Sequence, residues 1–248
     1  SSTLGYYNRG QQFPKVIVSN IDGSIQSVML PTLSAHQDDK KKVKDMMRRA
    51  IMTSSFLIFP MMIGMAVVAE PLVKIVLTDK WLPAVPFLQI FCISYALIPI
   101  HTANLQAINA MGRSDIFLRL EVVKKLLGLV ILGISLPFGV YAIAIGQVIS
   151  AIISTFINVY PNKHLLNYSY REQWADIMPS LVLAVIMGIT VYMFNLINIA
   201  AWKVLGLQLV VGVGSYIGLA KIFRVESLSY LNATLTNLFK RRKYNSEA

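Results

Sequence analysis

The sequence of 248 residues predicts an all-α membrane protein, and three observations lead to that fold class. Hydrophobic residues make up 55% of the chain and charged residues only 14%, whereas ordinary soluble domains carry about 25% charged residues. The mean hydropathy is +0.58. Apolar runs of about 20 residues recur, each long enough to cross a hydrocarbon core about 30 Å thick as a helix. Strand-like alternation of polar and apolar residues is absent, which argues against a transmembrane barrel.

Seven membrane-spanning helices are expected. The second contains Pro60 and Gly64, which allow a kink. The segment 71–83, with Trp81, is too short to cross and is predicted to lie at the membrane interface. The predicted spans are residues 13–33, 50–69, 84–110, 116–136, 138–160, 176–197 and 202–220.

The positive charge is distributed unevenly between the two sides of the predicted membrane. The formal net charge is +11, and 18 of the 23 Lys and Arg fall on one side, in residues 34–49, 111–125, 161–173 and 221–248. An excess of Lys and Arg is typical of cytoplasmic loops. We therefore expect 34–49 to be a basic cytoplasmic loop that continues as a helix on the membrane surface. The tail 221–248 is expected to be basic and cytoplasmic, and the charge pattern indicates orientation rather than nucleic-acid binding.

Catalytic and metal-binding motifs are missing from the sequence. Neither HExxH nor the phosphate-binding GxxxxGK[ST] occurs, and Cys92 has no second cysteine to pair with. Asp38 and Asp39 lie in a Lys-rich segment typical of solvated charge. We therefore expect no enzyme activity, no metal and no cofactor. Because the chain begins with Ser and leads directly into a span, it is expected to be part of a longer protein.

The first span is apolar overall but carries one polar face. Lys15, Ser19, Asp22 and Gln26 are spaced by four, three and four residues, which places them on one side of a helix. Lipid cannot satisfy such groups, so this face must contact protein or water. We interpret it as the wall of a polar cavity, and polar packing between helices is the alternative.

Charged residues at the start of the fourth span form a second candidate wall. The apolar part of this span, residues 126–136, is too short to cross alone, so the span must include Arg119, Glu121, Lys124 and Lys125. Glu121 and Lys125 have the spacing of an ion pair on a helix, which leaves Arg119 and Lys124 as surplus positive charge suited to phosphate. If the helix instead protrudes from the membrane, the same residues are ordinary basic residues of the cytoplasmic side.

The third and fifth spans contain further polar residues. His101 is a candidate proton-relay group, because imidazole titrates near neutral pH, and a hydrogen-bonded structural histidine is the alternative. Gln106 and Asn109 lie on a shared helical face. Gln147 and Asn158 are predicted to form hydrogen bonds between helices.

Several blocks of the sequence resemble the polysaccharide transporter family, in the expected order. They are LGYYNRGQQFPKVIVSNIDGSIQSVMLPTLS, AEPLVKIVLTDKWLPAVPFLQI, LQAINAMGRSDIFLRLEVVKK and PFGVYAIAIGQ, and they cover most of residues 4–160. This family contains lipid-linked oligosaccharide flippases of the O-antigen or colanic-acid type, within the multidrug/oligosaccharidyl-lipid/polysaccharide exporter superfamily. The resemblance implies that the seven spans form the C-terminal lobe of a two-lobed, MATE-like flippase.

The resemblance also implies a function. Such a protein translocates a lipid-linked oligosaccharide across the bacterial inner membrane by alternating access of its two lobes. The expected partners are an undecaprenyl-pyrophosphate-linked oligosaccharide, membrane lipids and the missing N-terminal lobe, with no nucleic acid and no cofactor. Proton or sodium coupling follows only by analogy, with His101 as the candidate residue.

Three alternative functions stay open at the level of sequence. A cation or drug antiporter of the same superfamily would favour an acidic, aromatic-lined cavity, whereas the charges within these spans are mainly basic. An integral-membrane enzyme of polysaccharide assembly would need a large outer loop, but the longest predicted here is 71–83. A membrane scaffold that transports nothing is the third alternative.

Overall fold

The computed structural model describes residues 2–196 and 200–231, and this part of the chain contains helices and turns but no strand. The prediction of an all-α protein is therefore confirmed. The helices are α1 (Ser2–Ser34), α2 (Lys40–Val67), α3 (Ala69–Val76), α4 (Val85–Ala96), α5 (Ile98–Ala110), α6 (Ser114–Ser135), α7 (Val140–Leu165), α8 (Tyr170–Tyr192) and α9 (Ala201–Ile222), with 3₁₀ turns at Asp79–Ala84, Leu136–Phe138 and Met193–Leu196.

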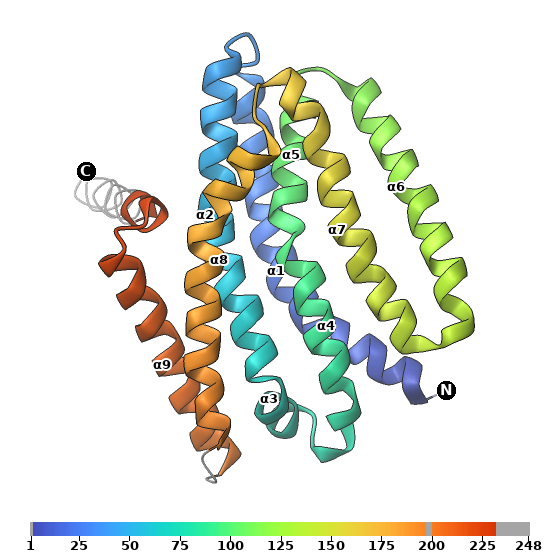
Figure 1. The fold of residues 1–248 in the computed structure, drawn as a ribbon, viewed down its shortest axis with the longest axis vertical. Helices are drawn as coiled ribbons and strands as arrows, with labels where there is room; N and C mark the ends of the chain where they lie inside the picture. The colour runs from blue at the N-terminus through green and yellow to red at the C-terminus, as the bar shows by residue number, and fades with distance from the viewer. Residues whose placement is uncertain (1, 197–199, 232–248) are drawn as a thin grey trace, which may run out of the picture.

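The long helices run side by side along the longest axis of the molecule (Figure 1). Packing is closest between α2 and α8, while α1 packs against α4 and α5, and α6 packs mainly against α7. In Figure 1, α6 and α9 lie at opposite edges of the bundle. Much of the outer surface of α6 is therefore exposed and apolar, as expected of a helix that faces lipid: Leu118, Leu126, Leu129, Val130 and Ile134 are each more than half exposed.

Five helical segments of the described chain are long and apolar enough to cross a membrane: 40–67, 79–110, 140–165, 170–195 and 201–222. The helices α1 and α6 are not among them, although both are long enough, with 33 and 22 residues. The polar face of α1 and the ionisable residues of α6 account for this difference. The chain is thus a multi-pass helical membrane protein, whereas the predicted count of seven spans is not confirmed.

The segment 34–49, predicted as a basic loop that continues as a helix on the membrane surface, is helical from Lys40 onward. Val43, Met47 and Ile51 are spaced by four residues and have no exposed surface, so one face of this charged segment packs into the protein. In the sequence, the charged residues on the other faces of this helix obscure the four-residue spacing of its apolar residues. The other predicted segment outside the spans, 221–248, begins in the last turn of α9, and its part from 232 onward lies outside the described residues.

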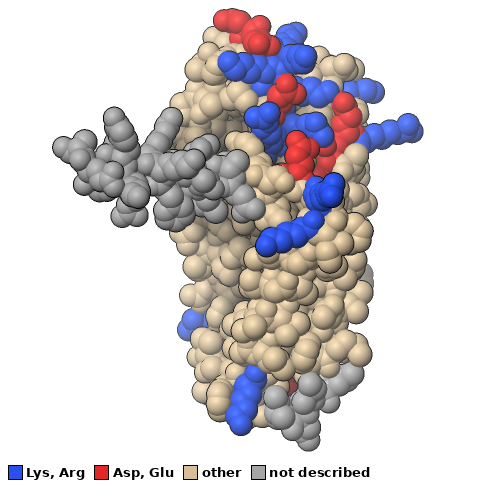
Figure 2. Space-filling model, turned by 90° about the vertical axis from the view of Figure 1, so that its left-hand side faces the viewer, with Lys and Arg blue, Asp and Glu red and all other residues tan. Residues whose placement is uncertain are grey.

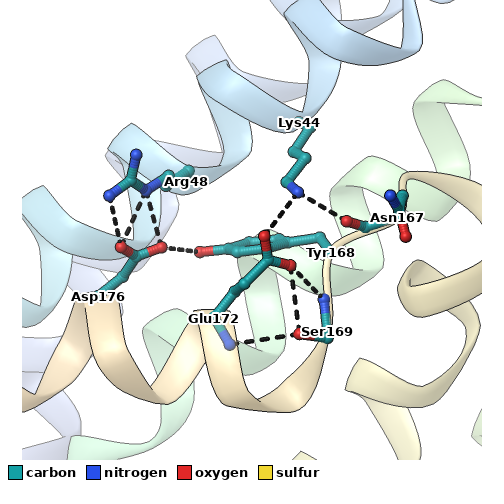
Figure 3. Close-up of polar contacts among 7 residues, drawn as sticks. All are labelled: Lys44, Arg48, Asn167, Tyr168, Ser169, Glu172 and Asp176. Atoms are coloured by element: carbon teal, nitrogen blue, oxygen red, sulfur yellow. Dashed lines mark hydrogen bonds and ion pairs between the residues drawn. The ribbon is translucent and has the colours of Figure 1, made fainter.

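Charged residues join the start of α2 to the start of α8 (Figure 3). Arg48 Nε donates to both carboxylate oxygens of Asp176, at 2.8 and 2.9 Å, and the Tyr168 hydroxyl donates to the same carboxylate at 2.7 Å. Burial and this hydrogen bond raise the pKa of Tyr168, so the phenol stays a neutral donor. Lys44 pairs with Glu172 at 3.0 Å. The two helices are thereby fixed to each other at this end of the molecule.

Figure 2 shows Lys, Arg, Asp and Glu side chains gathered at one end of the face that carries α2, α8 and α9. Below this end the surface is almost free of charge, apart from a few basic side chains. Figure 1 places the α1–α2, α5–α6 and α7–α8 turns at the same end. This arrangement is typical of a protein whose middle lies in hydrocarbon and whose charged end lies in water.

The third predicted span is broken into two helices at Leu97. Pro99 has no N–H, so it cannot donate to the Tyr95 carbonyl as a residue within a continuous helix would. At the break the Leu97 N–H donates to the Ser94 carbonyl at 3.3 Å, a tighter turn than that of an α-helix. The chain nevertheless continues in the same direction, because 79–110 still forms one candidate span.

Two glycines form the turns on either side of α6. Gly112 has φ 70° and Gly139 has φ 88°, in the left-handed region that other residues rarely adopt. The first ends α5 and the second precedes α7, so α6 and α7 form an antiparallel pair. This pair brings the charged half of α6 beside the polar face of α7.

Candidate functional site

A polar pocket of about 390 Å³ lies among α1, α4, α5, α6 and α7. Its lining contains hydroxyl and amide groups, a histidine, two lysines and one carboxylate. Within a bundle whose outer surface is apolar, such a concentration of polar groups is a candidate binding site. The polar residues of the lining are Gln11, Ser94, Tyr95, His101, Glu121, Lys124, Lys125, Gln147, Ser150 and Ser154.

The pocket has a surplus of positive charge, which comes from α6. Glu121 forms an ion pair with Lys124, whose side chain is only 14% exposed. The predicted pair of Glu121 with Lys125 was wrong. Lys124 and Lys125 point about 100° apart around the helix, and the more buried Lys124 is the lysine that contacts Glu121. Among the described residues no ion pair involves Lys125. Arg119 is exposed and does not line the pocket.

The His101 imidazole contacts α7 through both ring nitrogens. Nε2 lies 2.8 Å from Thr155 Oγ1, and Nδ1 lies 3.1 Å from Asn158 Nδ2. The ring is thus held in one orientation at the pocket wall. Asn158 forms the hydrogen bond between helices that the sequence suggested, while Gln147 lines the pocket and accepts from the Tyr7 hydroxyl at 3.4 Å.

The polar face of α1 lies outside the pocket for most of its length. Lys15 and Ser19 are exposed, and Asp22 is partly buried. Asp22 Oδ2 accepts from Gln26 Nε2 at 2.7 Å, whereas Asp22 Oδ1 is buried without a hydrogen-bond partner. The structure therefore does not bring these residues together with the lysines of α6.

One residue connects the polar face of α1 with the pocket. Gln11 lies four residues before Lys15 on the same helical face, and it lines the pocket. At the other end of this face, Gln106 of α5 donates to Gln26 Oε1 at 3.4 Å. The face thus begins at the pocket and continues along the bundle toward α5.

Sequence reasoning missed the contribution of α7 to the site. Gln147, Ser150, Ser154 and Asn158 are spaced by three, four and four residues, which is a helical face. Gln147 and Asn158 looked isolated only because the serines between them were not counted. This spacing was the signal that could have revealed a polar wall.

We expect the pocket to be accessible to water, and cysteine labelling tests this. In the full-length protein with Cys92→Ala, which removes a buried thiol, Ser150→Cys should react with a membrane-impermeant maleimide. The reaction needs a thiolate, which forms in a water-accessible site. Ile149→Cys is the matched control, because Ile149 is 47% exposed on the outer surface of the same helix, where lipid would cover it. Equal labelling at both positions would contradict the assignment of the pocket.

The class of molecule that these residues define is a multi-pass helical membrane protein with a charged pocket between its helices. A profile of the polysaccharide biosynthesis protein family matches residues 1–86. The chain is 27% identical over 223 residues to an uncharacterized membrane protein in the cps region of Klebsiella pneumoniae. The matched region covers 86% of this chain and 45% of that protein.

Two further curated proteins are similar to the chain. Lipopolysaccharide biosynthesis protein WzxC of Escherichia coli (strain K12) is 25% identical, with 76% of this chain and 40% of that protein covered. Teichuronic acid biosynthesis protein TuaB of Bacillus subtilis (strain 168) is 22% identical, with 77% and 40% covered. The chain thus spans less than half the length of each of these relatives.

Among solved structures, the lipid II flippase MurJ in an inward closed conformation has the same fold. The TM-score is 0.75 over 90% of this chain and 47% of that chain, at 17% sequence identity. These findings agree with the predicted resemblance: the chain is similar in sequence to proteins named for polysaccharide biosynthesis, and its fold is that of a lipid II flippase.

Proposed function

We propose that the chain is the C-terminal lobe of a bacterial inner-membrane flippase for an undecaprenyl-pyrophosphate-linked oligosaccharide. The observation that carries the proposal is the polar pocket, in which two lysines face one carboxylate beside neutral hydroxyl and amide groups. A pyrophosphate diester is an anion joined to a glycan, so its recognition needs both kinds of group. A cation antiporter would instead need an excess of carboxylates.

The two kinds of group have separate roles in this proposal. Lys124 and Lys125 attract the phosphates, because cations form short, charge-assisted hydrogen bonds to phosphate oxygens. Gln147, Ser150 and Ser154 replace water around the sugar hydroxyls. The polyprenyl tail stays in the bilayer, against the exposed apolar faces of the bundle. The headgroup alone then crosses the membrane, by rocking of two lobes around the site.

The exposed polar face of α1 is proposed to border the space between the two lobes. Lys15, Ser19, Asp22 and Gln26 would line that space, with the second wall supplied by an N-terminal lobe. The charged end in Figure 2 is proposed to be cytoplasmic. His101 is the candidate for coupling transport to a proton gradient.

Complementation tests the proposed function. The full-length wild-type protein is expected to restore surface glycan to a flippase-deficient strain that makes the matching repeat unit. Asp22→Ala should lower the surface glycan about twofold to tenfold, because it removes the hydrogen bond that orients Gln26, worth about 0.5–1.5 kcal/mol. Surface glycan is quantified by immunoblot at equal protein expression.

Ser27→Ala is the matched control for this substitution. Ser27 is exposed on another face of α1, and its hydroxyl bonds only to the Ser24 carbonyl of its own helix. It should therefore leave surface glycan unchanged. Wild-type glycan levels with Asp22→Ala would contradict the role of the α1 face, and a wild-type protein that restores no glycan would contradict the function itself.

A further inference from the structure

The hydrogen-bond partners of His101 suit both protonation states of its ring. With a neutral ring, Asn158 Nδ2 donates to Nδ1 at 3.1 Å, and Nε2–H donates to Thr155 Oγ1 at 2.8 Å. The Thr155 hydroxyl donates its hydrogen bond to the Ala151 carbonyl at 3.0 Å, so Oγ1 is free to accept from the imidazole. Both roles follow from the placement of the imidazole between these groups, because a tautomer is assigned from its partners.

Asn158 offers a second arrangement for the protonated ring. Its side chain has no exposed surface, and its Oδ1 is buried without a hydrogen-bond partner. If the side-chain amide of Asn158 rotates so that its two ends exchange places, Asn158 Oδ1 faces His101 Nδ1. A doubly protonated His101 then donates to Asn158 and to Thr155 at once. The exchange leaves the number of unpaired amide atoms unchanged. The ring can therefore take up a proton without movement of a helix.

The charge around His101 is set by α6. Glu121, Lys124 and Lys125 face the pocket from α6, and Tyr95 is the titratable group that faces it from α4. The groups from α1 and α7 are neutral amides and hydroxyls. Burial of the ring opposes a proton on the imidazole, and the positive field of two lysines against one carboxylate opposes it further. An anion bound to the lysines cancels that field.

We propose that the pocket binds an anion and a proton together, the anion at Lys124 and Lys125 and the proton at His101. This inference rests on the proposed function, because it requires an anion in the same pocket. Linkage makes the effect reciprocal: anion binding favours protonation of His101, and protonation strengthens anion binding by the same factor. Anion affinity then rises as the pH falls and His101 takes up its proton.

Calorimetry on the full-length protein in nanodiscs tests the proposal. The probe is farnesyl-diphospho-N-acetylglucosamine, because a pyrophosphate diester keeps its charge between pH 5 and 8. Titrations in two buffers of different ionisation enthalpy give the number of protons taken up with the probe. We expect proton uptake with the probe and an affinity at least about fivefold higher at pH 5.5 than at pH 8, the lower end of typical coupling between sites.

His101→Gln keeps a hydrogen-bonding side chain but cannot titrate. It should still bind the probe, with no proton uptake and a flat pH dependence. His164→Gln is the matched control, because His164 is exposed in the last turn of the same helix that carries Asn158. This control should keep both the uptake and the pH dependence of the wild type.

Substitutions of Asn158 test the amide as the group that positions the protonated ring. Asn158→Asp supplies a permanent acceptor and should shift the pH dependence of binding to higher pH. Asn158→Leu removes the acceptor and should shift it to lower pH. A merely structural role would not move the two profiles in opposite directions.

The outcomes separate this proposal from the proposed function. Binding without proton uptake, or uptake that survives in His101→Gln, would overturn the proton–anion site while leaving the flippase function intact. Loss of probe binding in the wild type at every pH would overturn the anion site in the pocket, and the proposal with it. Uptake that disappears in His101→Gln, and that shifts to higher pH in Asn158→Asp and to lower pH in Asn158→Leu, would support it.

Discussion

Replacing Lys124 and Lys125 together by alanine is expected to reduce flippase activity more than about 100-fold. The pocket contains these two lysines and Glu121, so the double substitution changes its net charge from +1 to −1. Each charge-assisted hydrogen bond to phosphate contributes about 1.5–3 kcal/mol, and the loss of two amounts to about 3 kcal/mol or more. Glu121 is also left without its partner and repels the substrate. The measurement is surface glycan in a flippase-deficient strain.

Lys41→Ala together with Lys42→Ala is the matched control for this result. Both side chains are exposed at the start of α2, away from the pocket, and the change in total charge is the same. The control should restore surface glycan as well as the wild type does. If the two double variants behave alike at equal expression, the pocket lysines have no specific role in transport.

Gly10→Ala is expected to destabilise the protein and to impair transport. A Cβ at position 10 would lie 2.7 Å from Phe87 Cβ and 2.8 Å from the Leu88 backbone nitrogen, so α1 and α4 would have to move apart. Overpacking of this kind costs about 1–3 kcal/mol. The next residue, Gln11, lines the pocket, so the displacement also changes the site. Thermal unfolding in detergent measures the loss of stability.

Gly23→Ala on the same helix should have the opposite effect on stability. Apart from the adjoining residues and backbone of α1 itself, no atom lies within 4 Å of the added Cβ. Alanine stabilises a helix relative to glycine by about 0.5–1 kcal/mol. The melting temperature should therefore stay equal or rise. A normal melting temperature in Gly10→Ala would show that the contact between α1 and α4 is looser than the structure indicates.

The fold class and most of the helices could be predicted from the sequence, because composition and run length alone identify helices in lipid. The start of α2 was expected to lie on the membrane surface, because its charged residues concealed the buried series Val43, Met47 and Ile51, which packs into the protein. The break at Leu97 was signalled by Pro99 but was read as part of one span. Both errors arose where local pattern and tertiary packing point in different directions.

The candidate site was predictable only in part. His101, Glu121, Lys124 and Lys125 stood out because ionisable groups are rare within membrane spans, and the structure places all four in one pocket. The partner of Glu121 depended on how α6 is turned against its neighbours, which spacing does not determine. A single serine such as Ser150 gives little signal, because a serine in a helix often bonds to its own backbone, and only its spacing with Gln147 and Asn158 marks a polar face.

The neighbourhood of the α1 face also depended on tertiary structure. Spacing alone showed that Asp22 and Gln26 share a side of a helix, but not which helix lies beside them. The structure places Gln106 of α5 there and leaves Lys15 exposed. Only Gln11 reaches the pocket, because it lies at the end of the face that is nearest to α4 and α7.

Flipping of a fluorescent polyprenyl-diphosphate oligosaccharide in proteoliposomes tests the central claim most directly. Dithionite, which does not cross the membrane, quenches only the lipid in the outer leaflet. With the full-length wild-type protein, the quenched fraction should rise from that of the outer leaflet to nearly all of the lipid. With Lys124→Ala and Lys125→Ala together, it should stay at the outer-leaflet value. Equal quenching by the two proteins, or none by the wild type, would contradict the assignment of this pocket to the passage of a lipid-linked saccharide.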